Sequence, residues 1–162
     1  MILTAYTIFH VVISLLGIFS GFVVVFGLLA RKRLDGWTAF FLVTTVATSV
    51  TGFFFPVHHF MPSHAVGIIS LIVLAVAIYA RYNRALAGGW RKTYVIGAVI
   101  ALYLNVFVGI VQAFQKVPAL KALAPTQTEP PFKLTQLVVL ALFVVLAIVA
   151  AIRFRTEPVR AV

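Results

Sequence analysis

Five long apolar runs follow one another along this chain, separated only by short polar or basic segments. Each run is close to 20 residues, the length that a helix needs to cross a hydrocarbon core of about 30 Å at about 1.5 Å per residue. Membrane-spanning strands would be about 10 residues long and would alternate apolar with polar side chains. The pattern therefore predicts an all-α fold, an integral membrane bundle of five transmembrane helices. The expected spans are approximately residues 4–30, 38–56, 65–82, 93–114 and 135–153.

The composition agrees with a chain that lies almost entirely within a membrane. Of the 162 residues, 63% are hydrophobic and 10% are charged, and the mean hydropathy is +1.13. A soluble domain has about 45–50% apolar and about 25% charged residues. We therefore expect residues 1–162 to form a single transmembrane domain, with no separate soluble catalytic domain. The absence of cysteine excludes disulfides, thiolate metal sites and cysteine nucleophiles.

The basic residues predict how the bundle is oriented. Ten of the thirteen Lys and Arg residues follow the first, third or fifth run, and three lie on the other side. Cytoplasmic loops carry the excess of Lys and Arg, so the N-terminus is expected outside and the C-terminus in the cytoplasm. The net charge of +10 is then a topology signal, and no nucleic-acid partner is expected. The ten are Arg31, Lys32, Arg33, Arg81, Arg84, Arg91, Lys92, Arg153, Arg155 and Arg160.

All four histidines are expected at the outer level of the membrane. His10 lies near the outer end of the first run, and His58, His59 and His64 lie in the stretch VHHFMPSH between the second and third runs. Imidazole nitrogens can bind zinc, copper or haem iron, and a histidine near the interface can transfer protons. The alternative is a polar hairpin in which the histidines bond only to the protein. The spacing matches no HxxxH or HExxH motif, so both interpretations and the identity of any cofactor stay open.

Polar side chains inside the predicted bundle form a second candidate site. Thr44 and Thr48 share one face of the second run, and Asn105 and Gln112 share one face of the fourth. An asparagine in the middle of a membrane needs a hydrogen-bonding partner, so we expect either contacts between helices or a polar pocket. The runs carry no Asp, Glu, Lys or Arg away from their ends, which argues against an ion pump.

The polar, proline-rich segment 115–134 is expected to be an outer loop folded over the end of the bundle. Its prolines, including Pro130 and Pro131, are expected to break the helix, and residues 117–123 could form one amphipathic turn. Glu129 is the one outer acid that could pair with a protonated histidine.

One stretch of the chain resembles known proteins. LYLNVFVGIVQAFQKVPALKALAPTQTEPPF, residues 102–132, is similar to a segment of short multi-pass proteins of bacterial inner membranes, which are uncharacterised. The resemblance covers 31 of the 162 residues. It implies a multi-pass protein of the bacterial cytoplasmic membrane and implies no activity.

The sequence predicts a small accessory or binding protein that acts without catalysis. Its expected partners are the lipid bilayer, a hydrophobic ligand, and another membrane protein or a second copy of the chain. It contains no nucleotide-binding loop, catalytic triad or phosphate-binding glycine motif. Two alternatives stay open: a haem- or metal-binding redox protein that uses the outer histidines, and a small-solute transporter that uses Asn105, Gln112 and the threonine face.

Overall fold

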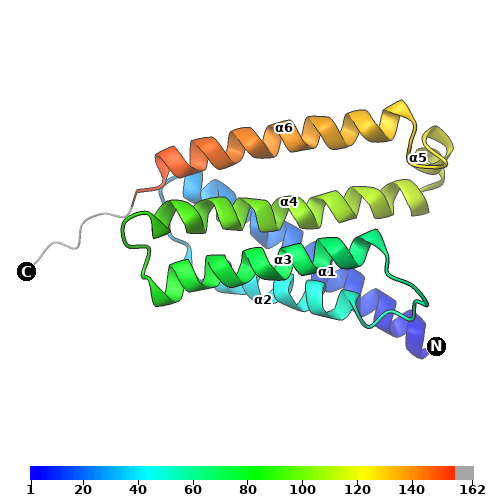
Figure 1. Ribbon diagram of the computed structural model, residues 1–162, viewed down its shortest axis with the longest axis horizontal. Helices are drawn as coiled ribbons and strands as arrows, with labels where there is room; N and C mark the ends of the chain where they lie inside the picture. The colour runs from blue at the N-terminus through cyan, green and yellow to red at the C-terminus, as the bar shows by residue number, and fades with distance from the viewer. Residues whose placement is uncertain (156–162) are drawn as a thin grey trace, which may run out of the picture.

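The computed structural model describes residues 1–155, which form a bundle of long helices that run alternately in opposite directions (Figure 1). The expectation of an all-α fold is confirmed for this part of the chain. A π-helical turn, Tyr79–Asn83, continues α3. The helices are α1 Ile2–Leu29, α2 Asp35–Gly52, α3 Pro62–Ile78, α4 Trp90–Lys116, α5 Pro118–Leu123 and α6 Pro130–Arg153.

Within this range, four helices are long and apolar enough to cross a membrane: α1, α3 with its π-helical turn, α4 and α6. Helix α2 packs against α1 and α3 but does not meet the same criterion, because six of its 18 residues are Thr or Ser. Its hydroxyls bond along the helix itself: Thr44 donates to the carbonyl of Phe40, and Thr48 donates to that of Thr44, each at 2.8 Å. These two threonines can therefore lie inside the bundle with their hydroxyl donors satisfied.

Three helices begin at a proline, namely Pro62 in α3, Pro118 in α5 and Pro130 in α6. Proline suits the first turn of a helix because its fixed φ is helical and its missing N–H would have no partner there. Pro118 separates α4 from α5, as expected, and α5 falls on the predicted amphipathic turn. The expectation that Pro130 and Pro131 break the helix was wrong, because they begin α6 five residues before the predicted position 135.

Helix α1 packs closely against α2 and α4. A Cβ atom placed on Gly21 would lie 2.6 Å from Cδ1 of Leu102 and 2.8 Å from Cε2 of Phe41. Both of these side chains are fully buried. Gly17, one turn earlier, lies beside polar side chains of α2 and α4. Gly17 and Gly21 thus allow the close approach of helices that a small-xxx-small pair provides in membranes.

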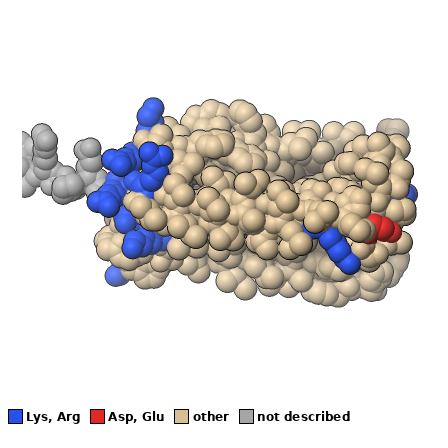
Figure 2. Space-filling view, turned by 90° about the horizontal axis from the view of Figure 1, so that it is seen from above, with Lys and Arg blue, Asp and Glu red and all other residues tan. Residues whose placement is uncertain are grey.

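Most of the basic residues gather at one end of the molecule (Figure 2). We call this the basic end; it contains the loops 30–34 and 84–89 and residues 153–155. Nine of the ten cations predicted for one side lie in the described part of the chain, and Arg160 lies outside it. The opposite end, which we call the histidine end, contains the N-terminus, the loop 53–61 and α5 (Figure 1).

Candidate functional site

His10 contacts the hairpin between α2 and α3. Its Nδ1 lies 2.8 Å from Oγ1 of Thr51, and its ring meets Phe55 edge-on at 5.0 Å. The Thr51 hydroxyl donates to the carbonyl of Ala47 at 2.6 Å, so the hydrogen between Thr51 and His10 belongs to the imidazole. His10 therefore carries its proton on Nδ1 and links α1 to α2.

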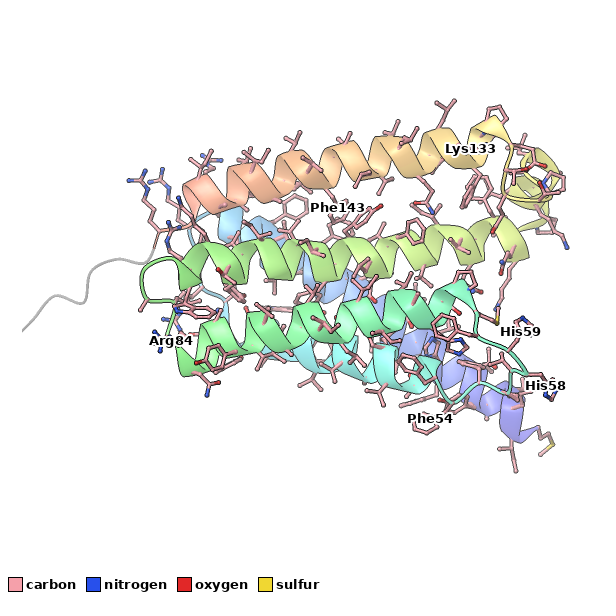
Figure 3. The ribbon with its side chains drawn as sticks, in the orientation of Figure 1. Phe54, His58, His59, Arg84, Lys133 and Phe143 are labelled. Atoms are coloured by element: carbon pink, nitrogen blue, oxygen red, sulfur yellow. The ribbon has the colours of Figure 1, made fainter. Side chains whose placement is uncertain are left out.

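The other histidines do not join His10 in one site. His64 accepts a hydrogen bond from the backbone N–H of Met61 at 2.9 Å and stacks on Phe53, so it caps the start of α3. His58 and His59 are exposed on the loop at the edge of the bundle (Figure 3). Among residues 1–155, no three His, Asp or Glu side chains lie close enough together to hold a metal ion. The histidines share one end of the molecule but converge on no centre.

Asn105 has a partner across the helix interface. Its Nδ2 donates to Oγ1 of Thr45 at 3.4 Å, and both side chains lie against the backbone of Gly17 in α1. The partner is Thr45, next to the predicted Thr44, whose own hydroxyl bonds within α2. Gln112 is exposed farther along α4 and does not meet Asn105 in the structure. The polar residues therefore form a contact that joins three helices.

Glu129 closes a turn just before α6 and does not pair with a histidine. Its carboxylate accepts hydrogen bonds from the Thr126 hydroxyl at 2.8 Å and from the backbone N–H groups of Thr126 and Thr128 at 3.3 and 3.1 Å. Desolvation raises the pKa of the Glu129 carboxyl. The hydrogen bonds together lower this pKa by more than desolvation raises it, so the net pKa lies below the ordinary value of 4.5. The ionised form is therefore the one that holds this turn.

We expect the turn at residues 126–129 to loosen on acidification. The pKa of this carboxyl is lower in the folded protein than in the unfolded chain, so its ionised form stabilises the fold fully at a pH above the unfolded-state pKa. That stabilisation is lost as the pH falls below about 4.5 and through the folded-state pKa. Amide exchange at Thr126 and Thr128, corrected for intrinsic rates, should be slow at about pH 6 and faster at about pH 3. In Glu129→Gln it should be fast at both. Equal protection of the wild type at both values would refute this role.

An ionisable side chain lies inside the bundle, contrary to the expectation from sequence. Arg81 belongs to the π-helical turn, and its side chain is only 2% exposed. Its guanidinium donates to the Asp35 carboxylate at the start of α2 and lies 5.1 Å from the ring centroid of Tyr94. π-Helical turns are rare and often occur at functional sites. The sequence signal was Asp35, an acid that closely follows the cations Arg31, Lys32 and Arg33.

A groove of about 910 Å³ lies between α4 and α6. Three of its 14 lining residues are cations, and the other 11 are aliphatic or aromatic. Phe143 points from α6 toward α4 (Figure 3), and its ring centroid lies 5.6 Å from that of Tyr103. Ala147 and Ala151 continue the α6 side of the groove toward the basic end. Their small side chains leave space between the helices that larger residues would fill.

The three cations stand at the basic end of this groove, and we call them the cationic mouth: Arg91 and Lys92 of α4, and Arg155 just after α6. Nη1 of Arg91 donates to the carbonyl of Ala151 at 3.4 Å, which joins the two helices at the mouth. Lys92 and Arg155 are exposed. The groove volume lies in the range of about 300–1,000 Å³ typical of ligand sites.

No known protein family, curated protein or solved structure matches this chain. Its function must therefore be argued from the site, because a helical bundle by itself implies no activity. Sequence reasoning missed the groove, although two signals were present. Ile96, Ile100 and Tyr103 recur at helical spacing along one face of α4, and Ala147 and Ala151 do so on α6.

Proposed function

We propose that the protein is a small, non-catalytic protein of the bacterial cytoplasmic membrane that holds the acyl chain of a membrane lipid between α4 and α6. The observation that carries this proposal is the composition of the groove, with apolar walls along its length and cations at one end only. A membrane lipid has the same division, with an apolar chain and a polar headgroup.

The length of the groove matches one leaflet. Tyr103 lies 12 residues beyond Arg91 on α4, which corresponds to about 18 Å along the helix. One leaflet provides about half of a hydrocarbon core of about 30 Å, or about 15 Å. A chain whose headgroup lay at the cationic mouth would therefore end near Tyr103, at the middle of the membrane.

The proposed topology has α2 as a fifth span. Its 18 residues are about 27 Å long, its buried Thr and Ser side chains face the bundle, and Phe40, Val43 and Val50 are exposed as lipid-facing residues would be. The cations of the basic end then lie on the cytoplasmic side, with the N-terminus outside. In this orientation the groove opens to the cytoplasmic leaflet.

The two alternative functions have less support. A metal or haem centre would need converging ligands, whereas His64 caps α3, His10 bonds to Thr51, and the remaining two histidines are exposed. A solute pathway would need polar groups free to contact the solute, whereas Asn105 donates to Thr45 against α1.

Filling the groove tests the proposal. We expect Ala147→Trp to displace the bound chain, because the indole would occupy space between α4 and α6. Excluding only two CH₂ groups of the acyl chain, at about 0.8 kcal/mol each, would weaken lipid binding about fifteenfold. The measurement is native mass spectrometry of protein released from a mild detergent, which counts the lipids that stay bound to each chain.

Ala141→Trp is the matched control, since Ala141 is an exposed residue of α6 that does not line the groove. It should retain lipid as the wild type does, at about one molecule per chain. A wild type that carries no lipid, or two tryptophan variants that retain lipid equally, would overturn the proposal.

A further inference from the structure

We infer that the lipid in the groove is an anionic glycerophospholipid whose phosphate is bound by the cationic mouth, Arg91, Lys92 and Arg155. The inference rests on the proposed function, because these cations select a lipid only if a chain enters the groove. It adds the chemical class of the ligand and the residues that recognise its headgroup.

The charge of the mouth is not neutralised by the part of the chain that the structure describes. No acid lines the groove, and the two acids among residues 1–155 are engaged elsewhere. Asp35 pairs with Arg33 and Arg81, and Glu129 lies at the histidine end. Within residues 1–155, the three cations of the mouth therefore have no acidic partner, and an anionic ligand could bind to them.

The arrangement suits a phosphate. Arg91 uses a donor on the Ala151 carbonyl, which fixes its guanidinium across the end of the groove, and a guanidinium has further N–H donors for an anion. Lys92 and Arg155 present exposed charges from the two helices on either side. A phosphodiester offers two charge-bearing oxygens and two ester oxygens that several separate cations can approach, and Arg and Lys both bind phosphate well.

The position of the cationic mouth in the molecule suits a ligand that comes from the membrane. The mouth lies at the basic end with six other described cations: Arg31, Lys32, Arg33, Arg81, Arg84 and Arg153. Basic pockets between membrane helices on the cytoplasmic side bind anionic headgroups, and each well-placed cation contributes about a fivefold preference. A general surface charge would give the same preference from any of these cations. If the lipid is bound in the groove, the cations of the mouth should contribute most of the preference for anionic lipid.

The test compares two double variants that remove one Lys and one Arg each. Lys92→Gln/Arg155→Gln discharges the mouth, and Arg31→Gln/Lys32→Gln discharges the same end of the molecule away from the groove. Each is offered phosphatidylglycerol and phosphatidylcholine with identical acyl chains, in competition, and native mass spectrometry counts the bound lipid. We expect the wild type to prefer phosphatidylglycerol, the mouth variant to lose about 25-fold of that preference, and the loop variant to keep it.

Binding of the acyl chain and recognition of the headgroup are tested separately. The mouth variant should still bind one lipid of either kind, and Lys92→Arg/Arg155→Lys should restore the preference because it restores the charge. If the wild type binds both lipids alike while Ala147→Trp loses them, the headgroup inference fails and the proposed function stands. Equal loss of preference in both double variants would also overturn the inference, since general surface charge would then explain the selectivity. A wild type that binds no lipid would remove both.

Discussion

Gly21→Leu is expected to lower the free energy of unfolding by about 3 kcal/mol. Even the first added carbon would lie 2.6 Å from Leu102 and 2.8 Å from Phe41, both fully buried, and the rest of the leucine side chain would need further space. Helix α1 would have to move away from α2 and α4. The better helix propensity of leucine offsets less than about 1 kcal/mol of this cost. The measurement is reversible unfolding of the detergent-solubilised protein in a titration with sodium dodecyl sulfate.

Gly36→Leu provides the matched control for this prediction. Gly36 lies in the first turn of α2, and apart from its chain neighbours and the adjacent backbone of its own helix, no described atom lies within 4 Å of a Cβ placed there. Its free energy of unfolding should stay within about 1 kcal/mol of the wild type or rise slightly. If Gly21→Leu and Gly36→Leu unfold at the same point, the close contact of α1 with α2 and α4 does not hold the bundle together.

Asp35→Asn is expected to destabilise the protein more than Arg81→Met. Removing the carboxylate leaves the guanidinium of Arg81 buried beside Tyr94 without its counter-charge. Breaking a fully buried pair costs about 3–5 kcal/mol, and the exposure of Asp35 reduces the expected cost to about 1–3 kcal/mol. Arg81→Met removes the buried charge together with its need for a partner and keeps apolar bulk, so its effect should be below about 1 kcal/mol.

The double variant Asp35→Asn/Arg81→Met completes a thermodynamic cycle for this pair. Its stability should return close to that of Arg81→Met alone, because the amide that replaces the Asp35 carboxylate no longer faces an unpaired charge. The same titration with sodium dodecyl sulfate measures all four proteins. If Arg81→Met is the more damaging single change, the ion pair is a net source of stability, and the view of Arg81 as a buried charge that depends on Asp35 is wrong.

The sequence was sufficient to predict the helices because apolar runs of membrane-spanning length have few alternatives. It was less reliable at their ends. Pro130 and Pro131 read as breaks, yet a proline in the first turn costs no hydrogen bond, and the backbone continues from there into α6. The Thr and Ser side chains of α2 lower its mean hydropathy, although Thr44 and Thr48 bond to their own helix. Length and composition therefore identify only α1, α3 with its π-helical turn, α4 and α6 as spans among the described residues.

The candidate site was harder to predict because it depends on which faces meet. The sequence predicted that Asn105 needs a hydrogen-bonding partner, because an unpaired amide is costly in a membrane, and the structure shows that the partner is Thr45 of α2. The groove depends on the separation of α4 from α6, which no pattern within one helix specifies. Arg81 was counted with the loop cations, because the sequence does not show that a π-helical turn extends α3 and directs this side chain inward.

A phosphatidylglycerol with a photoreactive group in its acyl chain tests the central claim most directly. After irradiation of the protein in lipid nanodiscs, mass spectrometry would identify the residues that the chain has labelled. Binding between α4 and α6 predicts that labels concentrate on groove residues such as Ile100, Val144 and Ala147. Labels spread evenly over other exposed apolar residues, such as Leu15 of α1 and Ile72 of α3, would contradict it and indicate ordinary contact with the bilayer.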